Sequence, residues 1–321
     1  MIKLILLLVI ISFNVQAKQI NGGTPVPKGA QIAGYNTLTF STDRNFSASN
    51  VDLGCTHNSG YQWYVWNYFG NTCERWMADD PFHFLADGSI KIDNSRDPSW
   101  FPTLATTTYI GSSPNFRGTA FGGGAYIEAE ISIDEEDFAK GNWIPAFWMH
   151  TLNHNLGTDA AQQWIGMPSP YAHFQEVDIM EFPFRKGSLM YTSTIHDLYG
   201  HWGVTCPGWC KTSTDRGEFS HAIVPKKTNW IHPHRYGVLW VPATADSLGY
   251  YEFYFDDQPI AYKISYTQYL NQPAPPTDYV DGNPTWTYGF GDVDHYIIII
   301  NTAVFKSVKI WQKDASHNIS N

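Results

Sequence analysis

Three carboxylates lie close together in the stretch 174–182, which reads FQEVDIMEF. They alternate with large apolar residues, as in a strand with one buried face, where each acid carries a large desolvation cost. Side chains two positions apart share a face of a strand, so Glu176 and Asp178 project together, whereas Glu181 points away. One extra residue at Ile179 and Met180, forming a β-bulge, would bring Glu181 back to the face of the other two acids.

The spacing of these acids suits hydrolysis of a glycosidic bond. Four strand steps of about 3.3 Å separate the α-carbons of Glu176 and Glu181 by about 13 Å, and side chains reaching about 4 Å each leave about 5 Å between the carboxyl groups. Retaining glycosidases hold these groups about 5 to 5.5 Å apart, and inverting ones about 6.5 to 9.5 Å. A retaining double displacement is therefore predicted. The alternative, a surface strand with solvated acids, leaves the large apolar Val177, Ile179 and Met180 unexplained.

The elements that position these acids are expected to be strands. Aromatic residues make up 16% of the 321 residues, alongside 26 Gly and 19 Pro, a mixture that favours strands and turns over helices. Turn residues separate short strand-like segments, and the unbroken run 297–300 is typical of a central strand covered on both faces. The expected strands are 35–41, 61–68, 89–92, 124–133, 144–150, 176–182, 190–196, 234–240, 249–255 and 295–304. An all-β sandwich follows.

The N-terminus has the pattern of an export signal. Residues 1–17 begin with a single charge at Lys3, continue as an apolar stretch over 4–13 and end at Ala17, where we expect cleavage. The apolar stretch is shorter than the roughly 18 to 20 residues that a membrane anchor needs. We therefore expect residues 18–321 to be secreted, to an extracellular or periplasmic location, without a membrane partner. Because no repeat or linker divides these residues, we expect them to form a single catalytic domain.

Charge and cysteine content narrow the function further. The net charge of −10 becomes −11 without Lys3, which disfavours nucleic acid as a partner. In an oxidising compartment we expect two disulfides between sequence neighbours, Cys55 with Cys73 and Cys206 with Cys210; a zinc site is the weaker alternative. Two Asn-x-Ser acceptor patterns, at Asn45 and Asn318, leave glycosylation open.

The motif Glu176-x-Asp178-x-x-Glu181 resembles the catalytic signature of glycoside hydrolase family 16 in its bulged, laminarinase-type form. The resemblance extends over nearly the whole chain after residue 17. Its other landmarks are the segments 87–92 (DGSIKI), 122–133, 141–149 (GNWIPAFWM), 236–256 and 297–304. It implies a β-sandwich of jelly-roll type with a concave substrate cleft.

The resemblance also implies the role of each acid. Glu176 is expected to be the nucleophile, Asp178 the central carboxylate that assists it, and Glu181 the general acid/base. Electrostatics supports this division, because Asp178 between two acids raises the cost of ionising all three. A proton then stays on Glu181 while Glu176 is charged.

Three further residues are expected to bind substrate. Trp148 would stack on a sugar ring, although core packing is nearly as good an interpretation of it. Trp143 would frame the same cleft, and His196 would lie near the acid/base. The histidines of His232-Pro-His234 suggest turn residues more than metal ligands. No metal and no cofactor are expected, and a structural calcium is left open.

The resulting expectation is an endo-acting, monomeric β-glucanase that cleaves β-1,3 or mixed β-1,3/1,4 linkages. A transglycosylase on the same scaffold and a non-catalytic glucan-recognition module are the alternatives. Recognition modules of this kind lack one or both catalytic Glu residues, and the present chain keeps both. Action on sulfated galactans is disfavoured by the negative charge. The segment 126–128 lacks an Arg, and Phe174-Gln175 replaces a Trp and a Gly that are common in the family; these departures affect the expected sugar subsites and not the three acids.

Overall fold

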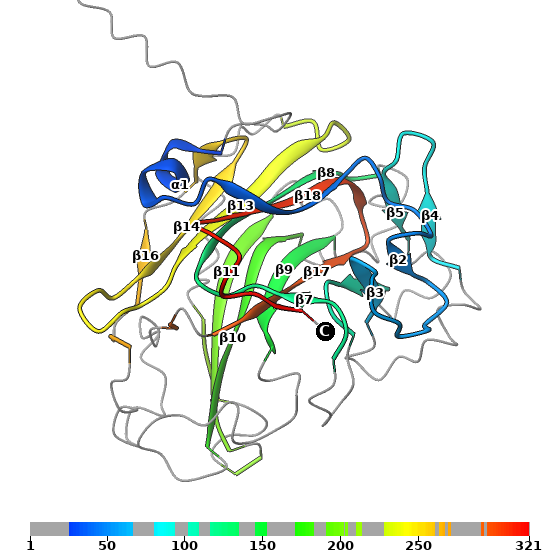
Figure 1. Ribbon diagram of the computed structural model, residues 1–321. Helices are drawn as coiled ribbons and strands as arrows, with labels where there is room; N and C mark the ends of the chain where they lie inside the picture. The colour runs from blue at the N-terminus through cyan, green and yellow to red at the C-terminus, as the bar shows by residue number, and fades with distance from the viewer. Residues whose placement is uncertain are drawn as a thin grey trace, which may run out of the picture.

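The computed structural model describes residues 26–66, 80–93, 102–108, 116–134, 145–152, 171–182, 191–201, 203–204, 210–213, 228–260, 263–266, 269–270, 290–291 and 294–320. Two large β-sheets pack against each other around one main hydrophobic core (Figure 1). This arrangement confirms the predicted all-β sandwich.

The first sheet has nine strands, with the order β15-β14-β13-β8-β18-β5-β4; β1 also pairs with β18, and β16 with β14. Its strands are β1 (Thr37–Asp43), β4 (Phe82–Phe84), β5 (Ile90–Ile92), β8 (Ala125–Ser132), β13 (His234–Val241), β14 (Tyr250–Phe255), β15 (Gln258–Pro259), β16 (Ile264–Ser265) and β18 (Val304–Gln312).

The second sheet has eight strands, with the order β12-β11-β10-β9-β17-β6-β3-β2. Its strands are β2 (Val51–Asp52), β3 (Trp63–Val65), β6 (Thr103–Ala105), β9 (Ala146–Thr151), β10 (Ala172–Glu181), β11 (Thr192–Gly200), β12 (Cys210–Ser213) and β17 (Tyr296–Asn301). A small third sheet pairs β7 (Thr119–Ala120) with β19 (Ile319–Ser320).

Period-two alternation builds the core between the large sheets. On β8, Ile127, Ala129 and Ile131 are fully buried in the main core. On β17, Ile298 and Ile300 join the same core, and the two isoleucines that alternate with them lie in a second buried cluster on the other face. The run 297–300 is therefore buried on both faces, as predicted.

One expected strand proved to be two. The stretch 295–304 divides into β17 and β18, which belong to different sheets. The chain turns between them at Thr302, whose φ is 35°. A β-branched residue rarely adopts this left-handed conformation, so no residue type at 302 indicated a turn. β10 also begins at Ala172, four residues before the expected start.

Helix α1 (Lys28–Ala33) packs on the outer face of the nine-stranded sheet, beside β13 and β14 (Figure 1). Its Ala30 is buried in a third cluster, which also contains Tyr126, Tyr254 and Trp311. A Cβ atom on Gly29 would lie 2.1 Å from the Tyr254 hydroxyl oxygen, so any larger residue at this position would require the Tyr254 side chain to shift. Within the described ranges, no helix has both the length and the apolar character needed to cross a bilayer.

Cys55 is disulfide-bonded. Cys73 and Cys206 lie outside the described residues, and Cys210 is described only by its backbone in β12. The pairing of sequence neighbours remains a prediction. The expected export signal, residues 1–17, also lies outside the described ranges.

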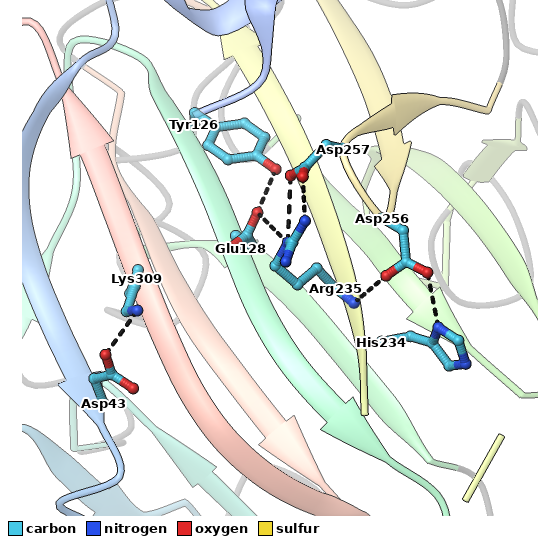
Figure 2. Close-up of polar contacts among 8 residues, drawn as sticks. All are labelled: Asp43, Tyr126, Glu128, His234, Arg235, Asp256, Asp257 and Lys309. Carbon is cyan, nitrogen blue, oxygen red and sulfur yellow. Dashed lines mark hydrogen bonds and ion pairs between the residues drawn. The ribbon is translucent and has the colours of Figure 1, made fainter. Parts of the chain in front are cut away.

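A buried acid lies on the outer face of the nine-stranded sheet (Figure 2). Only 3% of Glu128 is exposed, and Tyr126 donates a 2.8 Å hydrogen bond to its Oε2. The Arg235 guanidinium lies 3.9 Å from the same oxygen and also pairs with Asp257. Burial raises the pKa of Glu128 to about 7, while Tyr126 and Arg235 act in the opposite direction. Lys309, the cross-strand neighbour of Glu128 on β18, pairs instead with Asp43 at 2.7 Å.

This raised pKa makes a prediction for stability. Folded Glu128 holds its proton up to about pH 7, whereas Glu128 in the unfolded chain loses its proton near pH 4.5. The contribution of Glu128 to the free energy of unfolding is therefore fully present below pH 4.5 and is lost as the pH rises to 7. Glu128→Gln keeps a neutral acceptor for Tyr126. The free energy of unfolding of the wild type, minus that of the variant, should fall by about 3 kcal/mol between pH 4.5 and 7. Urea titrations across this range measure the difference; a constant difference would contradict the prediction.

Candidate active site

Strand β10 carries all three acids, and its neighbours fix which way they face. Glu176 pairs with His150 on β9 and with His196 on β11, and Asp178 pairs with Trp148 and Thr194. Directly opposite residues in paired strands lie on the same face of a sheet. These side chains therefore share the face of the eight-stranded sheet that lies away from the main core.

The predicted bulge is present between Asp178 and Glu181. Three steps along β10 correspond to two along β11, where Asp178 pairs with Thr194 and Glu181 with Thr192. Ile179 and Met180 are both buried in the main core, at 1% and 0% exposure. Two successive residues thus point inward, and Glu181 returns to the face of Asp178.

His196 links two of the acids. Its Nε2 atom lies 3.1 Å from Asp178 Oδ2 and 3.8 Å from Glu176 Oε1. The Asp178 side chain is 8% exposed and that of Glu176 is 28% exposed. The carboxylate of Glu176 is therefore the more accessible of the two. Asp178 lies within hydrogen-bonding distance of His196 Nε2, which can donate to it.

Trp148 lies on the face of the acids but is largely covered. It is 6% exposed, its Nε1 donates a 3.0 Å hydrogen bond to Asn301 Oδ1, and its ring meets Trp66 edge-on at 5.6 Å between centroids. It belongs to the second cluster, with Ala146 and Ile299 among others. These contacts fit the packing role that the sequence left open, and stacking on a sugar remains a prediction. Trp143 lies outside the described residues.

His150 was missed by the sequence analysis. It flanks Glu176 on the side opposite His196 and is 1% exposed. Its ring lies 6.2 Å from that of Trp148, and its Nδ1 is 3.1 Å from the carbonyl of Thr151, so the Nδ1 atom carries a proton. The alternation of β9 could have predicted this position. Residues two apart in a strand share a face, so with Trp148 on the face of the acids, His150 lies on that face as well.

A buried polar network supports β10 from the core side. Gln175 and Asp197 are cross-strand partners, and Gln175 Nε2 donates to Asp197 Oδ1 at 2.9 Å. The same oxygen accepts a 2.7 Å hydrogen bond from His173. Gln175 Oε1 accepts from Tyr251 on β14 at 2.9 Å and from Tyr296 on β17 at 3.0 Å.

These contacts tie β10 to its neighbours and to the opposite sheet. Gln175 precedes Glu176, and Asp197 follows His196, so the hydrogen-bonded pair on the core side lies directly behind the Glu176–His196 pair. Asp197 Oδ2 has no hydrogen-bond partner among the described residues, but the bonds made by Gln175 and by Asp197 Oδ1 join β10 to β11, β14 and β17 and so favour this strand register. The network therefore holds Glu176 and His196 in position.

Glu176, Asp178 and His196 are also the one set in the described part of the chain that could hold a metal ion. One donor atom from each lies within 4.8 Å of the others. At the His232-Pro-His234 segment, His234 instead contacts Asp256 Oδ2 at 2.8 Å and the Asn229 carbonyl at 3.2 Å, while His232 is exposed. His232 lies in the turn that precedes β13, as expected, whereas His234 is the first residue of β13 and contacts Asp256 in the turn after β14.

No protein-family model matches the chain, and no curated protein sequence is similar to it. Among solved structures, it is similar to LamAcat from Zobellia galactanivorans, with 13% identity, a TM-score of 0.45, and coverage of 87% of this chain and 99% of that one. It is similar to an inactivated β-agarase B mutant in complex with agaro-octaose, with 12% identity, a TM-score of 0.44 and coverage of 89% and 94%. It is also similar to the κ-carrageenase of Pseudoalteromonas carrageenovora in complex with an oligotetrasaccharide of κ-carrageenan. The sequence identity is 13% and the TM-score 0.38, and the match covers 86% of this chain and 94% of that one.

Proposed function

We propose that this protein is a secreted, monomeric, endo-acting glycoside hydrolase of the family 16 kind, which cleaves β-glucan with retention of anomeric configuration. One observation carries the proposal. The bulge at Ile179 and Met180 brings three acids of β10 to one face of the sheet. Grouping acids on a largely buried strand has a desolvation cost, and a shared catalytic role would explain why they are there. The resemblance of the motif and its ordered landmarks to the family supports it.

In the first step, a carboxylate oxygen of Glu176 attacks C1 of the sugar. The bond from C1 to the glycosidic oxygen breaks, and Glu181 gives its proton to the departing oxygen. A covalent glycosyl ester on Glu176 results. Glu176 suits the attack because its side chain is the more exposed of the two acids that contact His196.

In the second step, Glu181 removes a proton from water, and the water oxygen attacks C1. The ester bond to Glu176 breaks, which restores both acids to their starting protonation states. Asp178 acts through its charge on its two neighbours, and the 3.1 Å contact with His196 keeps it in place. This cycle needs no metal or other cofactor.

The proposed substrate is a neutral β-glucan with β-1,3 linkages, alone or mixed with β-1,4. The laminarinase-type motif and the aromatic content support it. The net charge of −11 for residues 18–321 opposes a sulfated polymer, which a basic cleft would attract.

A polysaccharide panel tests the substrate. We expect β-1,3-glucan and mixed-linkage glucan to be cut internally, giving a rapid loss of viscosity, with the β-anomer as the first product seen by NMR. Agarose, κ-carrageenan and chitin should remain intact. Activity confined to those three polymers would overturn the glucan proposal and leave the double displacement standing.

The same panel separates the alternative functions. Products longer than the starting oligosaccharide, formed at high acceptor concentration, would identify a transglycosylase. Binding to glucan without any cleavage would identify a recognition module.

A further inference from the structure

The two Asn-x-Ser patterns of the chain lie in different surroundings. Asn45 is in the connection between β1 and β2 and is exposed, whereas Asn318 precedes β19 and is half-buried. The side-chain amide of such an asparagine is the acceptor for an N-linked glycan in exported proteins. The two sites can therefore be compared by the hydrogen bonds that each side-chain amide already makes in the folded protein.

At Asn45 the amide is accessible. Its backbone carbonyl accepts a 3.0 Å hydrogen bond from Asn50, and within the described residues no hydrogen bond or ion pair involves its side chain. The next residue, Phe46, anchors the connection: it is 2% exposed, its backbone N donates to the Gly88 carbonyl at 2.9 Å, and its ring lies 6.0 Å from that of Trp63. The acceptor is thus held at the surface by a buried neighbour.

At Asn318 the amide is engaged on both atoms. Its Nδ2 donates to Gln312 Oε1 at 2.8 Å, and its Oδ1 accepts from Gln312 Nε2 at 2.9 Å and from the Gly122 backbone N at 3.3 Å. Gln312 is 1% exposed and also donates to the Gly122 carbonyl at 2.7 Å. A sugar on Nδ2 would have to occupy the space beside Gln312.

We propose that Asn45 is an N-glycosylation site of the exported protein and that Asn318 is not. The co-reactant is a lipid-diphosphate-linked oligosaccharide. The Nδ2 atom of Asn45 bonds to C1 of the first sugar, the bond from C1 to the diphosphate oxygen breaks and its electron pair leaves on the lipid diphosphate, and the proton released from the amide passes to water. The proposal requires export of the chain and is independent of the proposed glycosidase activity.

The position of Asn45 predicts what its glycan does. In the eight-stranded sheet, four strands lie between β10 and the edge strand β2, so the two are about 24 Å apart at about 4.8 Å per spacing. The glycan should therefore leave the three acids accessible. It would cover the neighbourhood of an edge strand, whose unpaired backbone groups otherwise invite association with other chains.

The test is expression in a eukaryotic secretory host, with the intact mass of the secreted protein measured before and after enzymatic removal of N-glycans. The wild type and Asn318→Gln should each carry one oligosaccharide. Asn45→Gln should carry none, and neither should Ser47→Ala, which keeps the acceptor and removes only the pattern. Both of these variants should retain wild-type activity on glucan.

A stability measurement checks that the Asn318 amide is engaged in the folded protein. Asn318→Gln should lower the midpoint of urea unfolding, because it breaks the contacts with Gln312 and Gly122, while Asn45→Gln should leave the midpoint of the deglycosylated protein unchanged. A glycan that persists in Asn45→Gln, or an unglycosylated wild type, would overturn the proposal. A second version of each chain, with the host's own leader replacing residues 1–17, distinguishes failure of export from failure of the site.

Discussion

Glu176→Ala is expected to lower kcat on glucan on the order of 10⁴- to 10⁶-fold, because the variant lacks the oxygen that bonds to C1. Added azide should restore turnover of an activated aryl glycoside by entering the vacated space, and the product should be the α-glycosyl azide, with inverted configuration. NMR of the product measures the configuration. The fold should be retained, since the Glu176 side chain is 28% exposed.

Glu130→Ala is the matched control. This glutamate lies on β8 of the other large sheet, its side chain is also 28% exposed, and it pairs with Arg44 at 3.3 Å. Loss of a surface ion pair costs little stability, so activity on glucan should equal that of the wild type. A comparable loss in both variants would show that the effect in Glu176→Ala is not catalytic.

Glu181→Ala should separate the two steps. On glucan, kcat should fall about 10²- to 10⁴-fold, the usual contribution of a general acid/base. On an aryl glycoside whose leaving group needs no proton, the first step should survive and the glycosyl ester should accumulate, visible by mass spectrometry. Azide should then release the β-glycosyl azide, with retained configuration, because it attacks the intermediate and not the substrate.

The pH profile provides a second readout for Glu181. The basic limb of kcat/KM, which reports loss of the acid's proton in the free enzyme, should disappear in Glu181→Ala for the aryl substrate. If Glu181→Ala gave the inverted azide and Glu176→Ala the retained one, the two roles would be reversed. The assignment of the nucleophile before the bulge and the acid after it would then be wrong.

The bulge was predictable from the sequence because only one local geometry reconciles the order of residues 176–181. Val177, Ile179 and Met180 have to be buried and the three acids do not, so the alternation must break once. Strands β8, β13 and β14 were predicted for a similar reason, since their alternation is regular and turn residues bound them. Local patterns therefore carried most of the architecture.

Features that depend on distant residues were not predictable in this way. Gln175 and Asp197 look like ordinary strand residues, and their role becomes visible only when Tyr251 and Tyr296 meet them from other strands. The separate β18 was missed for a different reason. The turn at Thr302 uses a conformation that threonine rarely adopts, and the order of the strands on either side of it comes from long-range pairing.

The strand order has a consequence for how this chain folds during synthesis. In the described part of the chain, β1 pairs with β18 alone, and β18 also separates β8 from β5 at the centre of the nine-stranded sheet. At roughly 5 to 20 residues per second, an interval on the order of 10 to 50 s passes between synthesis of β1 and of β18. During this time the nascent chain holds unpaired strand edges and an uncovered apolar face, which makes it prone to association with other chains. We therefore expect folding to be completed only after residues 304–312 emerge from the ribosome, and refolding from denaturant to be slow because its decisive contacts join opposite ends of the chain.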